Sequence, residues 1–261
     1  MYIFEILKPG TWLESDDHEW SWEVEGLLRN LESQFYEANL ALNLFLTSMN
    51  QNNEHPILEQ WQLDNARRYE IKKELENKHL NPYDHNTWDE IQLETEIRFK
   101  REKWSKGQLP REFIHNQPLI NARIFLYALD SFDKLLKVLK NYRDVPELIA
   151  DLHCELRQYF PDLLGVRNTA HHIEDRSRGL DASRPPQPLE LKPVDNQMVK
   201  SDSGVLILNS LNGTKYGNTM ANGHYGEVDV SPASMEILRS ILQRLLDSFE
   251  WKGPKTHLPN T

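Results

Sequence analysis

The chain has 261 residues and is acidic, with 30 Lys and Arg against 40 Asp and Glu and a formal net charge of -10. This balance disfavours a broad basic face for nucleic acid or an anionic membrane, so any nucleic-acid contact has to be local. The single cysteine, Cys154, excludes an internal disulfide and a cysteine-rich metal site, and favours a reducing compartment. The first residues do not resemble a signal peptide, and no apolar run approaches the roughly 20 residues that span a bilayer. We therefore expect a soluble, cytoplasmic protein without a membrane segment.

The first part of the chain has helical periodicity. Apolar residues recur every three or four positions and predict a long helix over residues 20–49. Two very polar helices are predicted over 57–79 and 87–106, the second ending at Gly107. They are expected to have a narrow apolar seam, which consists of Trp61, Ile71, Trp88, Ile91 and Phe99.

A more apolar helix is predicted over 118–142 and is expected to be central. Asp144 is expected to cap the next helix, over 145–159. A short helical segment follows at 168–178. The proline-rich stretch 181–200 is predicted to be a linker on the surface.

Near residue 200 the periodicity changes from helix to strand. Three strands, the first at 205–208, predict an antiparallel β-meander within residues 204–230. Asn-Gly pairs at 212–213 and 222–223 provide the positive φ angles that two-residue hairpin turns need. An amphipathic helix is predicted over 232–250.

Together these elements predict a mainly α fold. A meander of this size is not stable alone, so we expect it to dock on the helices within a single domain over residues 1–252. The remaining residues, 253–261, are predicted to be a flexible tail.

Side chains capable of chemistry are concentrated in one segment, residues 163–179, which reads LLGVRNTAHHIEDRSRG. If Asn168 is a helix N-cap, Arg167 stays outside the helix while His171 and His172 lie in its first turn. A guanidinium, free helix amides and an imidazole could then converge on a phosphate.

Arg167, Asn168 and His172 form an Arg-Asn-x3-His pattern that resembles the Arg-polar-x3-His motif of the HEPN superfamily. The resemblance implies an antiparallel helical bundle acting as a metal-independent endoribonuclease, in a defence or toxin–antitoxin setting, with RNA as its partner and without a cofactor. It also implies a homodimer in which two motifs face each other across a cleft. The alternative within the same family is a non-catalytic module that binds a protein partner, and the acidic net charge favours that alternative.

By this resemblance each residue of the segment has an expected role. Arg167 would stabilise the phosphate, His172 would act as general acid or base on the RNA 2′-hydroxyl, and Asn168 would orient them. His171 is a second candidate proton carrier. The expected contacts with flanking RNA phosphates come from Arg176 and Arg178.

Two other interpretations of the segment are open. In the first, Arg167 and His172 belong to an ordinary capped helix start with a solvated charged edge. Burial of either side chain in an ion pair would count against catalysis. In the second, the segment binds a metal through His171, His172, Glu174 and Asp175. Adjacent histidines on a helix point about 100° apart, which disfavours the metal.

His153 and Cys154 lie side by side within the predicted helix 145–159. The sequence reveals no third residue that would make them a catalytic pair, so packing is the expected role of His153.

Overall fold

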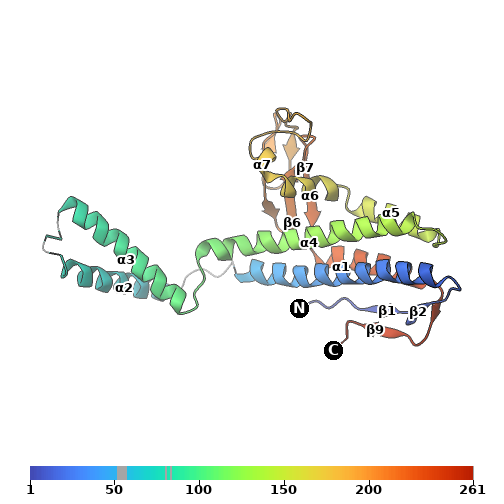
Figure 1. Cartoon of the computed structure of the whole chain (residues 1–261). Coiled ribbons are helices and arrows are strands. Elements are labelled where there is room, and N and C mark those ends of the chain that lie inside the picture. The colour runs from blue at the N-terminus through green and yellow to red at the C-terminus, as the bar shows by residue number, and fades with distance from the viewer. Residues whose placement is uncertain (52–57, 80, 83, 261) are drawn as a thin grey trace. The chain divides into compact units, whose positions relative to one another are not determined.

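The computed structural model describes residues 1–51, 58–79, 81–82 and 84–260 (Figure 1). The described part of the chain is mainly helical and contains small antiparallel sheets. It divides into two compact units, one formed by Met1–Thr47 with Pro118–Thr261 and the other by Ser48–Gln117. The sequence prediction of one domain over 1–252 did not separate these units.

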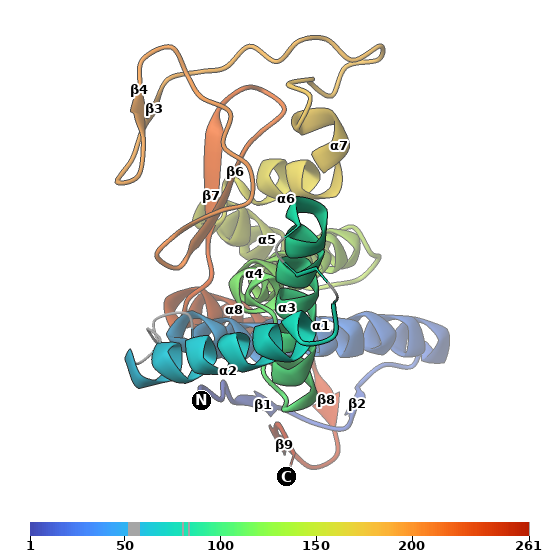
Figure 2. The same cartoon turned by 90° about the vertical axis from the view of Figure 1, so that its left-hand side faces the viewer.

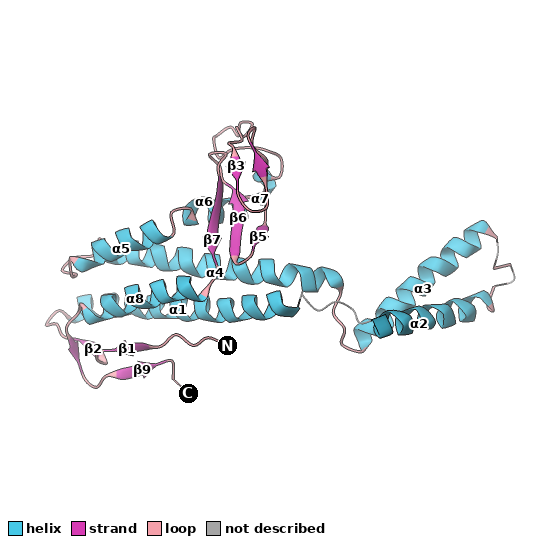
Figure 3. Cartoon of the chain, turned by 180° about the vertical axis from the view of Figure 1, so that it is seen from behind, coloured by secondary structure: helices cyan, strands magenta, loops and turns pink. Residues whose placement is uncertain are grey.

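The helices follow the predicted order (Figure 3). They are α1 (His18–Gln51), α2 (Leu58–Glu76), α3 (His85–Ser105), α4 (Arg111–Lys140), α5 (Leu148–Tyr159), α6 (Leu163–His171), α7 (Ile173–Arg176) and α8 (Pro232–Asp247). Among the described residues, no helix combines the length and the apolar character that crossing a membrane requires.

Two predicted helix starts are wrong. α4 begins at Arg111 rather than at Pro118, because the amides of Phe113 and Ile114 already donate to the Pro110 carbonyl at 3.0 and 3.2 Å. α5 begins at Leu148 rather than at 145. Asp144 does not cap it, because its φ of 55° lies in the left-handed region instead of the extended region that an N-cap adopts.

The strands are short. They are β1 (Ile6–Lys8), β2 (Trp12–Leu13), β3 (Val194–Asp195), β4 (Lys200–Ser201), β5 (Ser210–Asn212), β6 (Lys215–Thr219), β7 (Tyr225–Asp229), β8 (Trp251–Lys252) and β9 (Thr256–Leu258). The pairs β1–β9, β2–β8 and β3–β4 are antiparallel and two-stranded, and β5–β6–β7 form the three-stranded sheet.

Pairing of the chain ends corrects one prediction. Ile6 to Lys8 pair in register with Leu258 to Thr256, so the segment predicted to be a flexible tail contains a strand. Its backbone groups are satisfied by β1 instead of by solvent. The stretch 181–200, predicted to be a linker, likewise contains the β3–β4 pair.

The predicted meander is confirmed, with β6 between β5 and β7 and both pairs antiparallel. Its first strand begins at Ser210 and not at 205. Asn209 has a φ of 50°, and side chains replace part of the ladder there: Asn218 Oδ1 accepts from Asn209 N at 2.7 Å, and Thr219 Oγ1 accepts from Ile207 N at 2.9 Å. Only the first connection is a two-residue turn, because β6 and β7 pair through Thr219 and Tyr225 across a longer loop.

The core of the larger unit lies between the apolar faces of α1, α4, α5, α6 and α8. Within this unit, the meander stands on one side of these helices and the β1–β9 pair on the other (Figures 1 and 2). The predicted stripe of the central helix is buried; its fully covered residues include Phe125, Leu129, Phe132, Leu136 and Leu139.

The smaller unit contains the hairpin of α2 and α3 (Figure 3). Ile71, Leu75, Ile91 and Phe99 form its core. Trp61 and Trp88, predicted to belong to this seam, are 60% and 44% exposed. Charged side chains cover part of the hairpin core: Arg68 bonds Glu96 across the hairpin at 2.9 Å, and its guanidinium lies 3.9 Å from the centre of the Phe99 ring.

Candidate functional site

The segment 163–171 forms α6, which is held against the meander by polar contacts. The Thr169 hydroxyl, which is fully buried, donates to the Thr219 carbonyl at 3.1 Å. At the other end of α6, Asp162 Oδ2 accepts from the Glu227 amide at 3.2 Å. Asn168 therefore lies inside a helix and is not the N-cap that the sequence predicts.

Arg167 points from α6 toward α4. Its Nη2 lies 2.8 Å from Asp130 Oδ2, and its Nη1 donates to Asn168 Oδ1 at 2.9 Å. The Arg167 side chain is 16% exposed and that of Asp130 only 6%. Lys134 also contacts Asp130, at 2.7 Å. The guanidinium is thus held by a carboxylate of the neighbouring helix.

Asp133, one helical turn beyond Asp130, is the centre of a second charged cluster. Arg157 of α5 binds both of its oxygens at 2.6 Å, and His153 Nε2 lies 3.2 Å from Oδ1. Lys140 Nζ lies 2.8 Å from His153 Nδ1. Because a lysine ammonium can only donate, Nδ1 accepts, and the proton of the neutral ring lies on Nε2 facing Asp133. His153 therefore has partners that the sequence did not reveal.

His171 and His172 lie at the surface. His171 is the last residue of α6, and His172 lies between α6 and α7. Their rings are 4.9 Å apart in an edge-on arrangement, and His172 Nδ1 is 3.6 Å from Glu174 Oε1. The predicted single helix over 168–178 is interrupted at His172, whose φ of -110° and ψ of 46° are not helical.

The two arginines expected to contact RNA differ in exposure. Arg176 is buried, with 2% of its surface exposed, and donates to the Leu180 carbonyl, so its burial disfavours the expected phosphate contact. The Arg176 guanidinium thus stabilises the turn that follows α7. Arg178 is 63% exposed, and its Nη2 lies 2.6 Å from Asp175 Oδ1.

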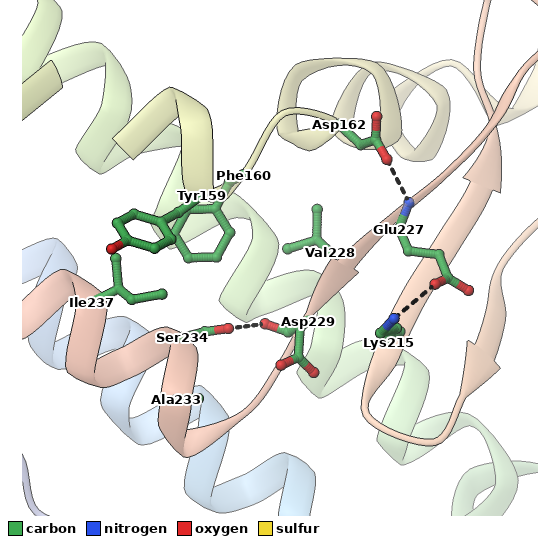
Figure 4. Close-up of a pocket in the computed structure, with 10 residues that line it drawn as sticks. All are labelled: Tyr159, Phe160, Asp162, Lys215, Glu227, Val228, Asp229, Ala233, Ser234 and Ile237. Carbon is green, nitrogen blue, oxygen red and sulfur yellow. Dashed lines mark hydrogen bonds and ion pairs between the residues drawn. The ribbon is translucent and has the colours of Figure 1, made fainter. Parts of the chain in front are cut away.

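A separate open pocket of about 350 Å³ lies where the end of α5 meets the meander and the start of α8 (Figure 4). Two of its polar side chains are already bonded: Lys215 Nζ lies 3.6 Å from Glu227 Oε2, and Ser234 Oγ donates to the Asp229 carbonyl at 2.7 Å. Among the described residues that line it, none belongs to the Arg-Asn-x3-His segment.

Comparison with models of known protein families, with curated proteins and with solved structures finds no match. The part of the chain that the structure describes also contains no group of three or more His, Cys, Asp or Glu arranged to hold a metal ion.

Asp130 and Asp133, which bind the cations of the site, are not among the candidate residues predicted from the sequence. A signal was present, because two carboxylates lie three residues apart among the apolar residues of the predicted central helix. Lys, Glu, Arg and Asp are almost never fully buried unless paired, so such acids predict cationic partners from neighbouring helices.

The cluster around His153 predicts a pH dependence of folding. Burial lowers the pKa of His153 from 6.5, and the charges of Lys140 and Arg157 lower it further, whereas Asp133 raises it. The unfolded chain therefore binds this proton more readily than the folded chain, and stability should be lost as the pH falls below about 6.5. We expect the free energy of urea unfolding to decrease between about pH 7 and about pH 5.5, and the decrease to be smaller in His153→Gln.

His257→Gln is the control for this prediction, because His257 is 62% exposed at its side chain. Equal pH dependence in wild type and His153→Gln would contradict the assignment.

Proposed function

We propose that the chain is a non-catalytic, HEPN-like helical module that acts by binding a protein partner. The observation that supports this proposal is the ion pair of Arg167 with Asp130, in which both side chains are largely buried. A phosphate approaching Arg167 would have to displace a carboxylate that already neutralises it. Such a guanidinium ties α6 to α4 and is a poor anion site.

The contacts around Arg167 support a structural role as well. Val166 and Thr169 are fully buried, and Asn168 accepts from Arg167 itself. The segment thus connects three parts of one unit: α4 through Asp130, the meander through Thr219, and α7 through the chain.

A metal-independent endoribonuclease is the second candidate, and the exposed histidines favour it. His171 and His172 are exposed and adjacent, with their rings 4.9 Å apart. This activity requires Arg167 to leave Asp130, or a cation such as Arg178 to replace it at the phosphate.

Labelled RNA incubated with purified protein in chelator separates the two candidates. We expect no cleavage by wild type, Arg167→Ala or His172→Ala. Arg167→Ala should lower the free energy of unfolding by about 2 kcal/mol, because Asp130 keeps only Lys134. His172→Ala should change it by less than about 0.5 kcal/mol, because the residue is exposed.

A double-mutant cycle between Arg167→Ala and Asp130→Ala provides the internal control, and we expect a coupling energy of about 1–3 kcal/mol. If wild type cleaves RNA in chelator and folded Arg167→Ala and His172→Ala do not, the result would favour the nuclease. An unmeasurable coupling energy would remove the structural role of Arg167.

A further inference from the structure

One face of α3 is buried against α2, and the opposite face has no partner within the described residues of this hairpin. Phe99 marks the buried side. At 100° per residue, Leu93, Ile97 and Trp104 all lie roughly 120° to 160° around the helix from Phe99. Leu93 is 64% exposed and Trp104 is 48% exposed. We define the α3 outer face as these three residues together with Glu90, Glu94, Lys100 and Arg101.

The charges on the α3 outer face are ordered along the helix. Glu90 and Glu94 lie toward its N-terminus, and Lys100 and Arg101 lie toward its C-terminus, with Ile97 between them. Glu94 also pairs with Arg98 at 2.8 Å. Among the described residues of the smaller unit, Glu90, Lys100 and Arg101 form no ion pair with one another or with the rest of that unit, and the Lys100 and Arg101 side chains are exposed.

The inner side of the hairpin differs in this respect, because its cations are paired. Arg67 binds Glu102 through two bonds of 2.8 Å, and Lys103 contacts Asp64. Within the described residues of the hairpin, Glu90, Lys100 and Arg101 have no such partner.

This arrangement is self-complementary. Consider a second copy of α3 that packs antiparallel, with the two-fold axis at Ile97. Ile97 then meets Ile97 of the second copy, and each residue before Ile97 meets the residue equally far after Ile97 in that copy. Glu94 then meets Lys100 of the second copy, and Leu93 meets the aliphatic part of Arg101, whose guanidinium reaches toward Glu90. A parallel arrangement would place like charges opposite each other, which is unfavourable.

We propose that two copies of this chain form a homodimer through antiparallel packing of their α3 outer faces. Each copy contributes an apolar centre at Ile97, and each acidic half binds the basic half of the other copy. A nucleic acid would be attracted by Lys100 and Arg101 but repelled by Glu90 and Glu94 and by the net charge of -10, so a second copy fits this face better. The inference does not depend on the role of Arg167.

Charge reversal tests the interface in the full chain. Light scattering with size-exclusion chromatography, supported by sedimentation equilibrium, should show a dimer for wild type. We expect Lys100→Glu/Arg101→Glu to weaken dimerisation at least tenfold, because like charges then face each other at both ends. Glu90→Lys/Glu94→Lys should do the same.

Restoration of charge complementarity distinguishes a lost interface from a damaged fold. Mixing the two double variants should restore dimers as heterodimers, and the quadruple variant should form homodimers again. Lys73→Glu/Lys78→Glu, in the last turn of α2 and the turn that follows it, is the matched control and should leave the dimer intact, because both lysines are exposed but lie outside the α3 outer face.

Three results would overturn the proposal. The first is a wild-type chain that stays monomeric at high concentration, including one that instead binds single-stranded RNA through Lys100 and Arg101. The second is a dimer that survives both double charge reversals. The third is a mixture of the double variants that stays monomeric although each variant has the wild-type circular dichroism spectrum.

Discussion

Asp133→Ala is expected to lower the free energy of unfolding by about 3 kcal/mol, because it removes the buried carboxylate that accepts two charged hydrogen bonds from Arg157. Asp133 is 2% exposed and accepts two bonds of 2.6 Å from Arg157. Without it, His153 and Arg157 both lose their carboxylate partner, and His153 keeps only its contact with Lys140. For a chain of this size the melting temperature should fall by about 10 °C.

Asp195→Ala is the matched control, since Asp195 also pairs with a cation but is 72% exposed at its side chain. Its removal should change the free energy of unfolding by no more than about 0.5 kcal/mol. Thermal and urea unfolding followed by circular dichroism measure both variants. An Asp133→Ala protein that melts with the wild type would show that the cluster contributes nothing to stability.

The positions of the helices could be predicted because apolar periodicity depends on residues near one another in sequence. The stripe from Phe125 to Leu139 is one example, since every third or fourth residue has to face the same core. Helix ends were less predictable. Pro118 looks like a helix start but lies inside α4, since the preceding turn is stabilised by the Pro110 carbonyl.

The partners of the charged residues could not be predicted in the same way. Arg167 meets Asp130 across two helices, and nothing in its local sequence specifies this partner. The same holds for His153, whose ring lies between Lys140 of α4 and Asp133. A local motif can be recognised in the sequence while the carboxylate that neutralises its arginine lies elsewhere in the chain. Whether such a carboxylate is present decides between an anion site and a structural ion pair.

The two Asn-Gly pairs of the meander show that glycine can be required for two different physical reasons. Gly213 has a φ of 60° and Gly223 a φ of 83°, so both adopt the conformation that disfavours other residues. A Cβ at Gly213 would meet no atom within 4 Å, whereas a Cβ at Gly223 would lie 1.8 Å from the Glu190 carbonyl oxygen. The sequence predicts the positive φ at both glycines, but it does not predict the close approach of the Glu190 carbonyl to Gly223.

We therefore expect unequal costs for the same substitution at the two turns. Gly213→Ala should lower the free energy of unfolding by about 1 kcal/mol, the cost of a side chain in the left-handed region. Gly223→Ala should lower it by about 3 kcal/mol, because the backbone of residues 190–192 has to move as well. That movement would also break the bond from Lys192 N to the Gly223 carbonyl, which is 3.0 Å long.

Urea unfolding of the two variants under identical conditions measures the difference, and limited proteolysis reports whether residues 190–192 are released. Faster cleavage near Lys192 is expected in Gly223→Ala and not in Gly213→Ala, because only the first substitution displaces the segment that crosses the turn. Equal losses of stability at the two glycines would mean that only the backbone conformation matters. The packing of residues 190–192 against the meander would then contribute nothing measurable to the free energy of unfolding.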